Sequence, residues 1–587
     1  MKRICSITTI LFSLVLLFSC SPEKSKTKQP TFSWDNATVY FVYVDRFVNG
    51  STENDVNYGR IVDYGTDYKN TATFHGGDLI GLTQKLREGY FTDLGINAIW
   101  VTGVYEQIHG WVGGGSKNDF PHYAYHGYYP MDFTMIDKNY GTIEEFRTFV
   151  DLAHEQGIRI IMDVGLNHPG YNTLLDAVQY NFGGVKLNEA EAAEHIDKLY
   201  EGKDLPHYKI YGYLRHFDFE NDSVWDNWWG YDWIRTADEV DKDVLTESIF
   251  GLPDFKTEKT EAVKLPPLLK NKWAMEGDDF QPWVNPSAVK YRKDMDLAPT
   301  DYVIKWISAW VEEFGIDGFR CDVVENIEMF RWKQLNEECN AALATYRKNN
   351  PEKAASKWTD GVWMTGDIWD SGIEYRPDCA DAGYASIVNF TFPKDGNLNS
   401  IGEVWQEYAD YLNTRDDWNT LTYLNYTYKR DVDINNMIDN GTTLLLSPGA
   451  IQIFYGDEVA RPVGAGFQTS DPAQGYRGDM IWGENQDVLV HWQKLGKFRN
   501  NHLSVGAGKQ IDLGDNTYAR TYEKDGITDK VVVKLTNEAI STVNVAGIFK
   551  DETKVRNAYT GEEKFVKAGT VEFSANNKVI LVEGVDN

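Results

Sequence analysis

The sequence has few cysteines for its length. Only five occur in 587 residues, and two of them, Cys5 and Cys20, lie near the N-terminus. The other three, Cys321, Cys339 and Cys379, have no paired spacing. This excludes a disulfide framework and a cysteine-based zinc pattern. Cys321 lies inside an apolar run, and we expect it to be a small core residue.

Basic residues are also scarce. The chain has 58 Lys and Arg against 88 Asp and Glu, which gives a formal net charge of -30. This balance argues against nucleic acid and anionic lipid surfaces as partners and favours a neutral or cationic ligand. A simpler reading is that the acidity only keeps the surface solvated. The 19 Trp and 34 Tyr suit either sugar stacking or the packing of a large barrel.

One apolar run near the N-terminus, Ile7–Phe18, follows two basic residues and is too short to span a bilayer comfortably. It leads into Leu17–Cys20, which resembles a bacterial lipoprotein cleavage box. We therefore expect residues 1–20 to be a lipoprotein signal peptide, Cys20 to carry the lipid, and residues 21–34 to be a tether. The protein would be exported and would touch the cell envelope membrane only through that lipid. A plain secretory signal with an incidental cysteine is the alternative.

Strand-like and helical segments alternate through most of the chain. The helical segments include Gly141–Gln156, in which Thr142 and Glu145 form a capping pattern, Asp301–Phe314 and Asn435–Leu446. Eight such repeats predict an α/β fold, a (β/α)₈ TIM barrel over about residues 35–500. The predicted strands are Thr38–Phe47, Ile96–Thr102, Ile158–Leu166, Ile316–Val323, Val362–Trp369, Ala385–Phe392, Leu421–Thr427 and Ile451–Gly456.

Two regions depart from this repeat. The connection after the third strand, about residues 169–294, is too long for a loop and predicts a small inserted domain. Its aromatic cluster, Trp225–Trp233, is better explained by packing than by sugar stacking. Short alternating runs in residues 505–587 predict a C-terminal all-β domain, a β-sandwich. These runs are Tyr518–Tyr522, Lys530–Thr536, Ser541–Val545, Lys554–Asn557 and Val571–Phe573.

The third, fourth and fifth predicted strands each end in a carboxylate. Their apolar runs lead to Asp163, Asp322 and Asp367, and the third run is followed by Asn167 and His168. Strands that are buried along their length and polar only where they emerge describe the catalytic face of a parallel barrel.

These motifs together resemble the α-amylase superfamily of glycoside hydrolases, in particular the periplasmic-type α-amylases of Gram-negative bacteria. The resemblance covers nearly everything after the tether. Each motif alone is weak, but their order on successive barrel elements is specific. The motifs are Phe74–Leu79, His126–Asp132, Asp163–His168, Gly251–Asp254, Gly318–Asp322, Met364–Trp369 and Ser447–Glu458.

The resemblance implies retaining hydrolysis of α-glucosidic bonds in starch, glycogen or maltooligosaccharides. Asp322 matches the nucleophile, and Arg320, two residues earlier in the strand, can keep it ionised and oriented. His168 matches a sugar-contacting histidine, and Tyr128 matches the aromatic platform under the cleaved sugar. Asp163 either holds the strand end together or takes part in catalysis directly.

The resemblance also implies calcium. Asn167 and Asp254 match positions that bind Ca²⁺ in many α-amylases, with a backbone carbonyl near Asn326. Oxygen ligands from two loops suit Ca²⁺, which takes six to eight of them.

The fifth strand departs from the family pattern. The family has a catalytic Glu there, and this chain has Asp367, a carboxylic acid one methylene shorter. This retracts the proton by roughly 1 Å, a displacement that can cost on the order of 10²-fold in rate. Glu403 cannot supply the missing acid, because it lies in the helical stretch Ile401–Leu412.

The seventh strand departs further. The family ends it in a His-Asp pair that holds sugar hydroxyls, and an ungapped alignment places Thr427 and Tyr428 there. A shift of one residue gives Tyr426 and Thr427, and neither register offers a carboxylate. Asp431 and Asp433 follow the strand and would need a local slip to reach the site.

Two functional hypotheses remain open. The first is an exported α-glucan hydrolase that uses Asp322 as nucleophile and Asp367 as a retracted acid, with impaired activity because Asp367 and Tyr428 replace catalytic-type residues. The second is a non-catalytic glucan-binding protein that keeps an amylase-like cleft. An adhesion or assembly subunit has no positive support in the sequence.

Overall fold

The computed structural model describes residues 32–585, apart from 61–70, 118–119, 183–184, 187, 189, 192–223, 237, 394–396 and 425–432. Two predicted functional residues, Cys20 and Tyr428, lie outside the described residues, as do the signal peptide and most of the tether.

Eight parallel strands form a closed barrel, which confirms the predicted fold class and all eight predicted strands. Neighbours around the barrel follow the order of the chain, and the last strand closes on the first. The strands are β1 (Thr38–Val42), β2 (Ala98–Val101), β7 (Arg159–Val164), β8 (Gly318–Cys321), β9 (Trp363–Gly366), β10 (Ser386–Asn389), β11 (Asn419–Tyr423) and β12 (Ala450–Phe454).

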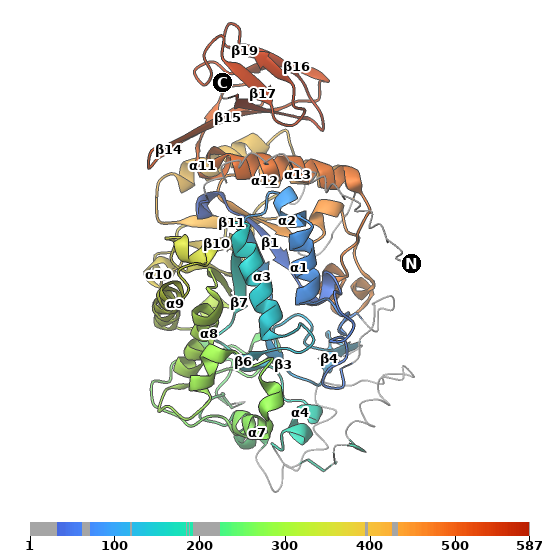
Figure 1. Ribbon diagram of the computed structural model, residues 1–587, viewed down its shortest axis with the longest axis vertical. Coiled ribbons are helices and arrows are strands. Elements are labelled where there is room, and N and C mark those ends of the chain that lie inside the picture. The colour runs from blue at the N-terminus through green and yellow to red at the C-terminus, as the bar shows by residue number, and fades with distance from the viewer. Residues whose placement is uncertain are drawn as a thin grey trace, which may run out of the picture.

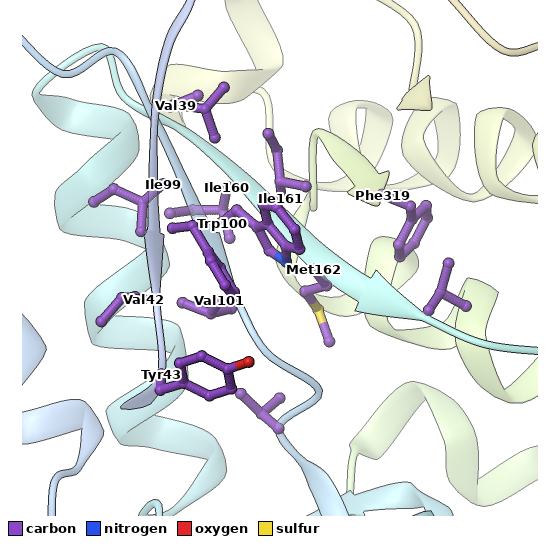
Figure 2. Packing of buried hydrophobic residues seen from close by; sticks show 14 of the residues in the cluster. Val39, Val42, Tyr43, Ile99, Trp100, Val101, Ile160, Ile161, Met162 and Phe319 are labelled. Atoms are coloured by element: carbon purple, nitrogen blue, oxygen red, sulfur yellow. The ribbon is translucent and has the colours of Figure 1, made fainter. Parts of the chain in front are cut away.

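Burial on both faces explains the apolar composition of these strands. Every residue of β1, β2, β7 and β8 is buried, because one face meets the barrel interior and the other meets helices. Figure 2 shows side chains of these four strands packed together, among them Val39, Ile99, Ile161 and Phe319.

Helices surround the barrel (Figure 1), and the predicted ones are confirmed to within two residues at either end. Thr142 and Glu145 form the expected capping box: the Glu145 N–H donates to Thr142 Oγ1 at 3.3 Å and the Thr142 N–H donates to Glu145 Oε2 at 2.7 Å. Glu403 is exposed on its helix, as expected. The helices are α1 (Leu79–Arg87), α2 (Tyr90–Asp93), α3 (Ile143–Glu155), α8 (Pro299–Phe314), α9 (Met329–Asn349), α10 (Pro377–Asp381), α11 (Ile401–Leu412), α12 (Ile434–Leu445) and α13 (Gln486–Asn501).

The described part of the long connection between β7 and β8 contains only short helices before α8. It contains α4 (Leu174–Gln179), α6 (Val224–Asn227) and α7 (Pro267–Met275). Trp228, Trp229 and Trp233 are buried, which supports packing as the role of the aromatic cluster.

Four short strands between β2 and α3 were not predicted. They form two antiparallel pairs, and the last of them pairs with the β7–β8 connection through the Met135–Val284 bridge. The two connections therefore build one layer beside the barrel. The strands are β3 (Tyr105–Gln107), β4 (Val112–Gly114), β5 (Phe120–His122) and β6 (Pro130–Ile136).

The C-terminal part forms a six-stranded and a two-stranded sheet. Val532 and Val582 of the first and Val543 and Val571 of the second share a buried cluster, so the sheets pack face to face. The five predicted runs correspond to strands of this part, and three strands were missed, namely β13, β18 and β20. The strands are β13 (Lys509–Asp512), β14 (Thr517–Lys524), β15 (Ile527–Leu535), β16 (Ile540–Asn544), β17 (Lys554–Asn557), β18 (Glu563–Phe565), β19 (Thr570–Ser574) and β20 (Val579–Gly584).

The C-terminal sheets lie at one end of the molecule next to α11, α12 and α13, whereas α4 and α7 lie at the other end (Figure 1). The exact domain boundaries stay predictions. None of the helices in the described ranges combines the length and the apolar character needed to cross a membrane.

Candidate active site

Three carboxylates meet at the carboxyl ends of three adjacent barrel strands. Asp163 lies in β7, Asp322 follows β8 and Asp367 follows β9. Backbone hydrogen bonds fix the last two: the Asp322 N–H donates to the Val164 carbonyl at 2.8 Å, and the Asp367 N–H donates to the Cys321 carbonyl at 3.0 Å. The parallel ladder thus sets the carboxylates side by side, as the strand-end pattern predicted.

The Arg320 guanidinium joins all three carboxylates. Its Nη1 lies 2.9 Å from Asp163 Oδ1 and 2.6 Å from Asp322 Oδ1, and its Nη2 pairs with Asp367 Oδ2. Burial alone would lower the pKa of Arg320, but Asp163 and Asp322 raise it above its ordinary value. Arg320 therefore stays charged and orients Asp322, as predicted, and it also holds Asp367.

Asp163 is the most enclosed of the three. Its Oδ2 accepts hydrogen bonds from the Tyr128 hydroxyl at 2.9 Å and from Trp100 Nε1 at 3.1 Å. Burial, opposed by Arg320 and supported by Asp322, raises the pKa of Asp163 to about 6. These contacts favour the first of the two predicted roles, in which Asp163 holds the strand end together.

A small pocket of about 20 Å³ lies beside Asp322. Asp367 is not among the residues that line it, although it shares Arg320 with Asp322. The pocket thus opens onto the predicted nucleophile and not onto the predicted acid. The titratable residues that line it are Tyr105, Tyr128, Asp163, His168 and Asp322.

The two predicted sugar-contacting residues both lie at this pocket. The His168 Nδ1 is 3.2 Å from the Pro169 carbonyl, and burial lowers the pKa of His168, so the ring is neutral at pH 7. The Tyr128 N–H donates to His126 Nδ1 at 3.0 Å, and the two rings stack. The Tyr128 ring is thereby held in place next to Asp163 and Asp322.

The backbone directly after the nucleophile position is strained. Val323 adopts φ 47° and ψ 51°, the left-handed region that a β-branched residue rarely enters. Such a conformation costs on the order of 1–3 kcal/mol and concentrates at functional sites. It turns the chain sharply after Asp322, so that Val324–Asn326 can begin a short helical turn.

The three predicted calcium residues come together at the junction of the barrel and the β7–β8 connection. Asn167 Nδ2 lies 2.8 Å from Asp254 Oδ1 and 3.5 Å from the Asn326 carbonyl. Asn167 Oδ1 is buried and has no hydrogen-bond partner in the described part of the chain. Arg235 Nε donates to Asp254 Oδ2 at 2.6 Å, and burial raises the pKa of Asp254 to about 7.

This arrangement fits a cation in part. It offers a free amide oxygen, a carboxylate and a carbonyl, and the remaining oxygens would have to be water. Arg235 already neutralises one side of Asp254, which lowers the charge that a cation would meet. No group of three or more His, Cys, Asp or Glu side chains in the described ranges could hold a metal.

Comparisons with known proteins show the family of the chain. The model of the α-amylase catalytic domain matches residues 41–203. The periplasmic α-amylase of Escherichia coli (strain K12) is 41% identical over 498 residues, which cover 82% of this chain and 69% of that protein. This chain belongs to the α-amylase family.

Other members of the family share smaller parts or only the fold. A cyclomaltodextrin glucanotransferase of Paenibacillus macerans is 34% identical over 148 residues, 25% of this chain and 20% of that protein. The structure of an Anoxybacillus α-amylase has a TM-score of 0.57 at 20% identity and covers 95% of this chain and 100% of its own. An acarbose complex of the Geobacillus thermoleovorans α-amylase has a TM-score of 0.57 at 19% identity, with the same coverage.

Most of the segment that matches the seventh-strand motif of the α-amylase family lies outside the described residues. Tyr428 and Asp431 lie outside the described residues. Asp433 is described, and its side chain caps α12 by accepting a hydrogen bond from the Asn435 N–H at 2.7 Å. It is exposed there, so Asp433 does not replace the missing carboxylate.

Sequence reasoning missed several aromatic residues around the site. Trp100 and Tyr105 contact Asp163, and Trp369 is 63% exposed beyond β9, stacked on Phe390 at 6.3 Å between ring centroids. The signal was available for Trp369, because it lies two residues after Asp367 in a recognised motif. Trp100 looked like an ordinary core residue of its strand.

Proposed function

We propose that this chain is an exported α-amylase-type glycoside hydrolase that acts on α-1,4-glucans with retention and turns over slowly. The observation that carries the proposal is the Arg320 cluster. In this cluster, Asp322 lines the pocket beside Tyr128 and His168, whereas Asp367 is ion-paired with Arg320 and does not line that pocket.

In the proposed mechanism, Asp322 attacks the anomeric carbon and forms a covalent glucosyl ester. A second carboxyl group should protonate the departing oxygen and later activate water. Arg320 keeps Asp322 ionised through a charge-assisted hydrogen bond at 2.6 Å. Tyr128 would lie under the reacting sugar, and His168, being neutral, would hydrogen-bond to its hydroxyls.

The proposed impairment has two sources. Asp367 is shorter than the family's Glu and is ion-paired with Arg320, so protonating it would break that pair. Tyr428 in place of the seventh-strand carboxylate cannot accept hydrogen bonds with a full charge, and losing one such bond typically costs about 1.5–3 kcal/mol. Both changes weaken interactions that strengthen in the transition state.

Calcium belongs to this proposal as a structural ion. Asn167, Asp254 and the Asn326 carbonyl would hold it, and when bound it would tie the β7–β8 connection to the barrel. The convergence of these groups and the unpaired Asn167 Oδ1 support the assignment.

A non-catalytic glucan-binding protein is the second candidate. It is favoured by the position of Asp367, which does not line the pocket. Both candidates keep a cleft that binds sugar, so binding alone does not separate them.

Parallel measurements of binding and hydrolysis separate the candidates. We expect hydrolysis of soluble starch at least about 10³-fold below that of an intact homologue. Maltooligosaccharide binding should persist, and His168→Ala or Tyr128→Ala should weaken it. Ordinary turnover that Asp322→Asn abolishes would contradict the impairment, and binding without any turnover would favour the second candidate.

Export and lipidation are supported by the sequence before residue 35 and by similarity to a protein named as periplasmic. If Cys20 carries the lipid, Cys20→Ala removes the residue that is acylated and should move the protein from the membrane to the soluble fraction. Stable anchoring needs more than one acyl chain, and a lipoprotein cysteine is multiply acylated. Wild-type protein found wholly in the soluble fraction would contradict lipidation and leave a plain secretory signal.

A further inference from the structure

The two carboxylates that flank Arg320 differ in access. Asp322 lines the pocket and its side chain is 22% exposed. Asp367 is 12% exposed, its Oδ2 pairs with Arg320, and its Oδ1 is buried with no hydrogen-bond partner among the described residues. A nucleophile therefore borders the pocket, whereas the group that should deliver a proton is held by Arg320 and does not line the pocket.

The other titratable groups of the pocket do not fill this role. Among the described residues, the Asp163 carboxylate only accepts hydrogen bonds, and the donors are Arg320, Tyr128 and Trp100. His168 Nδ1 donates to the Pro169 carbonyl at 3.2 Å, so this proton is already engaged.

The two tyrosines of the pocket are equally unsuited. Burial raises the pKa of Tyr105 and of Tyr128, and the Tyr128 hydroxyl already donates to Asp163. The described part of the pocket thus contains a nucleophile without a proton donor.

From this arrangement we infer that the site cleaves α-glucosides whose leaving group departs as a stable anion, and discriminates strongly against the sugar alkoxides of glucan chains. This inference rests on the proposed role of Asp322 as nucleophile. It narrows the substrate class of the same site to activated glucosides, such as glucosyl fluorides and aryl glucosides.

The first step balances without an acid for such substrates. An Asp322 oxygen forms a bond to the anomeric carbon, the bond from that carbon to fluorine breaks, and fluoride leaves with the electron pair. A glucan would have to release an alkoxide in the same step, which is a far poorer leaving group. General acid catalysis contributes typically 10²–10⁴-fold, and this is the factor that the glucan loses.

The second step, hydrolysis of the ester, also proceeds without a general base. Water must attack the anomeric carbon of the Asp322 ester and lose its proton to the solvent. Azide needs no such proton transfer: its terminal nitrogen bonds to the anomeric carbon, the ester bond breaks, and Asp322 is released as a carboxylate. The product is an α-glycosyl azide with net retention.

The test compares two substrates that share one glycosyl part, α-maltotriosyl fluoride and maltotetraose, on the full-length wild-type protein. We expect the fluoride to react at least about 10²-fold faster. Aryl glycosides of graded leaving-group acidity should show a steep dependence of rate on that acidity. Added azide should raise turnover of the fluoride and give the α-azide as product.

Variants separate this inference from the proposed function. Asp322→Asn should abolish turnover of the fluoride, and Glu403→Gln, an exposed carboxylate on α11, should change neither rate. Asp367→Glu should raise the maltotetraose rate by less than about tenfold, because the seventh-strand carboxylate is still missing. It should leave the fluoride rate nearly unchanged, so that the ratio of the two rates falls.

Each contrary result has one meaning. Equal rates on the two wild-type substrates, or no response to azide, would overturn the inference and leave Asp322 as nucleophile. Fluoride turnover that survives Asp322→Asn would overturn the proposed function. A wild-type protein that binds maltotetraose and cleaves neither substrate would overturn both and establish the glucan-binding candidate.

Discussion

Among the described residues, Arg320 and Lys272 are each surrounded by three carboxylates, and only the Arg320 cluster borders the pocket at the strand ends. Arg320 pairs with Asp163, Asp322 and Asp367 at the carboxyl end of the barrel strands. Lys272 of α7 pairs with three carboxylates in the layer beside the barrel, namely Glu106, Asp132 and Glu276. The charges are alike, but the surroundings differ.

The Lys272 cluster is closed. The side chains of Lys272, Glu106 and Asp132 are 0% exposed, and Asp132 also accepts a hydrogen bond from Trp273 Nε1 at 2.7 Å and pairs with Arg292 at 3.2 Å. Burial alone would raise the pKa of Asp132, but Lys272 and Arg292 overcome it and lower the pKa. Two cations, Lys272 and Arg292, therefore share the three buried carboxylates.

The Arg320 cluster is open and incompletely matched. Burial raises the pKa of Asp163 to about 6, Asp322 reaches the pocket, and Asp367 keeps one buried oxygen without a partner in the described residues. The comparison teaches that access and incomplete pairing, and not the number of charges, make the Arg320 cluster the candidate for function.

The largest effect should come from opening the closed cluster. Lys272→Met removes the cation that the three buried carboxylates share and leaves Arg292 beside only two of them. Breaking a buried ion pair in this way costs about 3–5 kcal/mol. Denaturant unfolding at pH 7 measures it. Lys264→Met, at an exposed lysine 3.5 Å from Asp296, is the control and should cost less than about 0.5 kcal/mol. A loss below about 1 kcal/mol in Lys272→Met would show that the cluster is not a structural centre.

A smaller effect should distinguish the two clusters, because their contributions to the free energy of unfolding should change with pH in opposite directions. The pKa of Asp163 is raised, so its contribution to stability is present below about pH 4 and is lost as the pH rises through about 6. Asp163→Asn should therefore gain on the order of 2 kcal/mol relative to the wild type between these pH values.

Asp132 should behave in the opposite way. Its pKa is lowered, so its contribution is present above about pH 4 and is lost as the pH falls through its folded value. The deficit of Asp132→Asn should shrink in acid. Unfolding free energies of both variants and the wild type at about pH 2, 3, 4, 5, 6 and 7 provide the measurement, because the Asp132 contribution changes below about pH 4 and the Asp163 contribution between about pH 4 and 6. The same sign for both variants would contradict the comparison.

The smallest effect concerns a third cation, Arg235, which pairs with the buried Asp254 and with the exposed Glu258. In its exposure, it is intermediate between the closed Lys272 cluster and the open Arg320 cluster. If calcium joins Asn167 and Asp254, Ca²⁺ at ten times its dissociation constant should stabilise the fold by about 1.4 kcal/mol. The melting temperature in Ca²⁺ and in a chelator measures it. Asp254→Asn should remove the response, and Asp241→Asn, at an exposed carboxylate, should keep it. Equal melting temperatures of the wild type in both conditions would count against a calcium site.

The site was predictable where it follows from the strand ends. Asp163, Asp322 and Asp367 come at the ends of three consecutive buried strands, and parallel pairing brings such ends together. The link from Arg320 to Asp367 was not predictable, because which carboxylate a guanidinium reaches depends on side-chain directions across strands.

The sequence by itself determined the barrel, its helices and the family, because the alternation of apolar strands and amphipathic helices is a local pattern. Only the tertiary structure decided that Arg320 pairs with Asp367 and that Lys272 is enclosed by three carboxylates. Glu106 and Lys272 are far apart in the chain and meet only where the two connections pack together. The physical reason is that burial and ion pairing depend on distances between segments, which no local periodicity encodes.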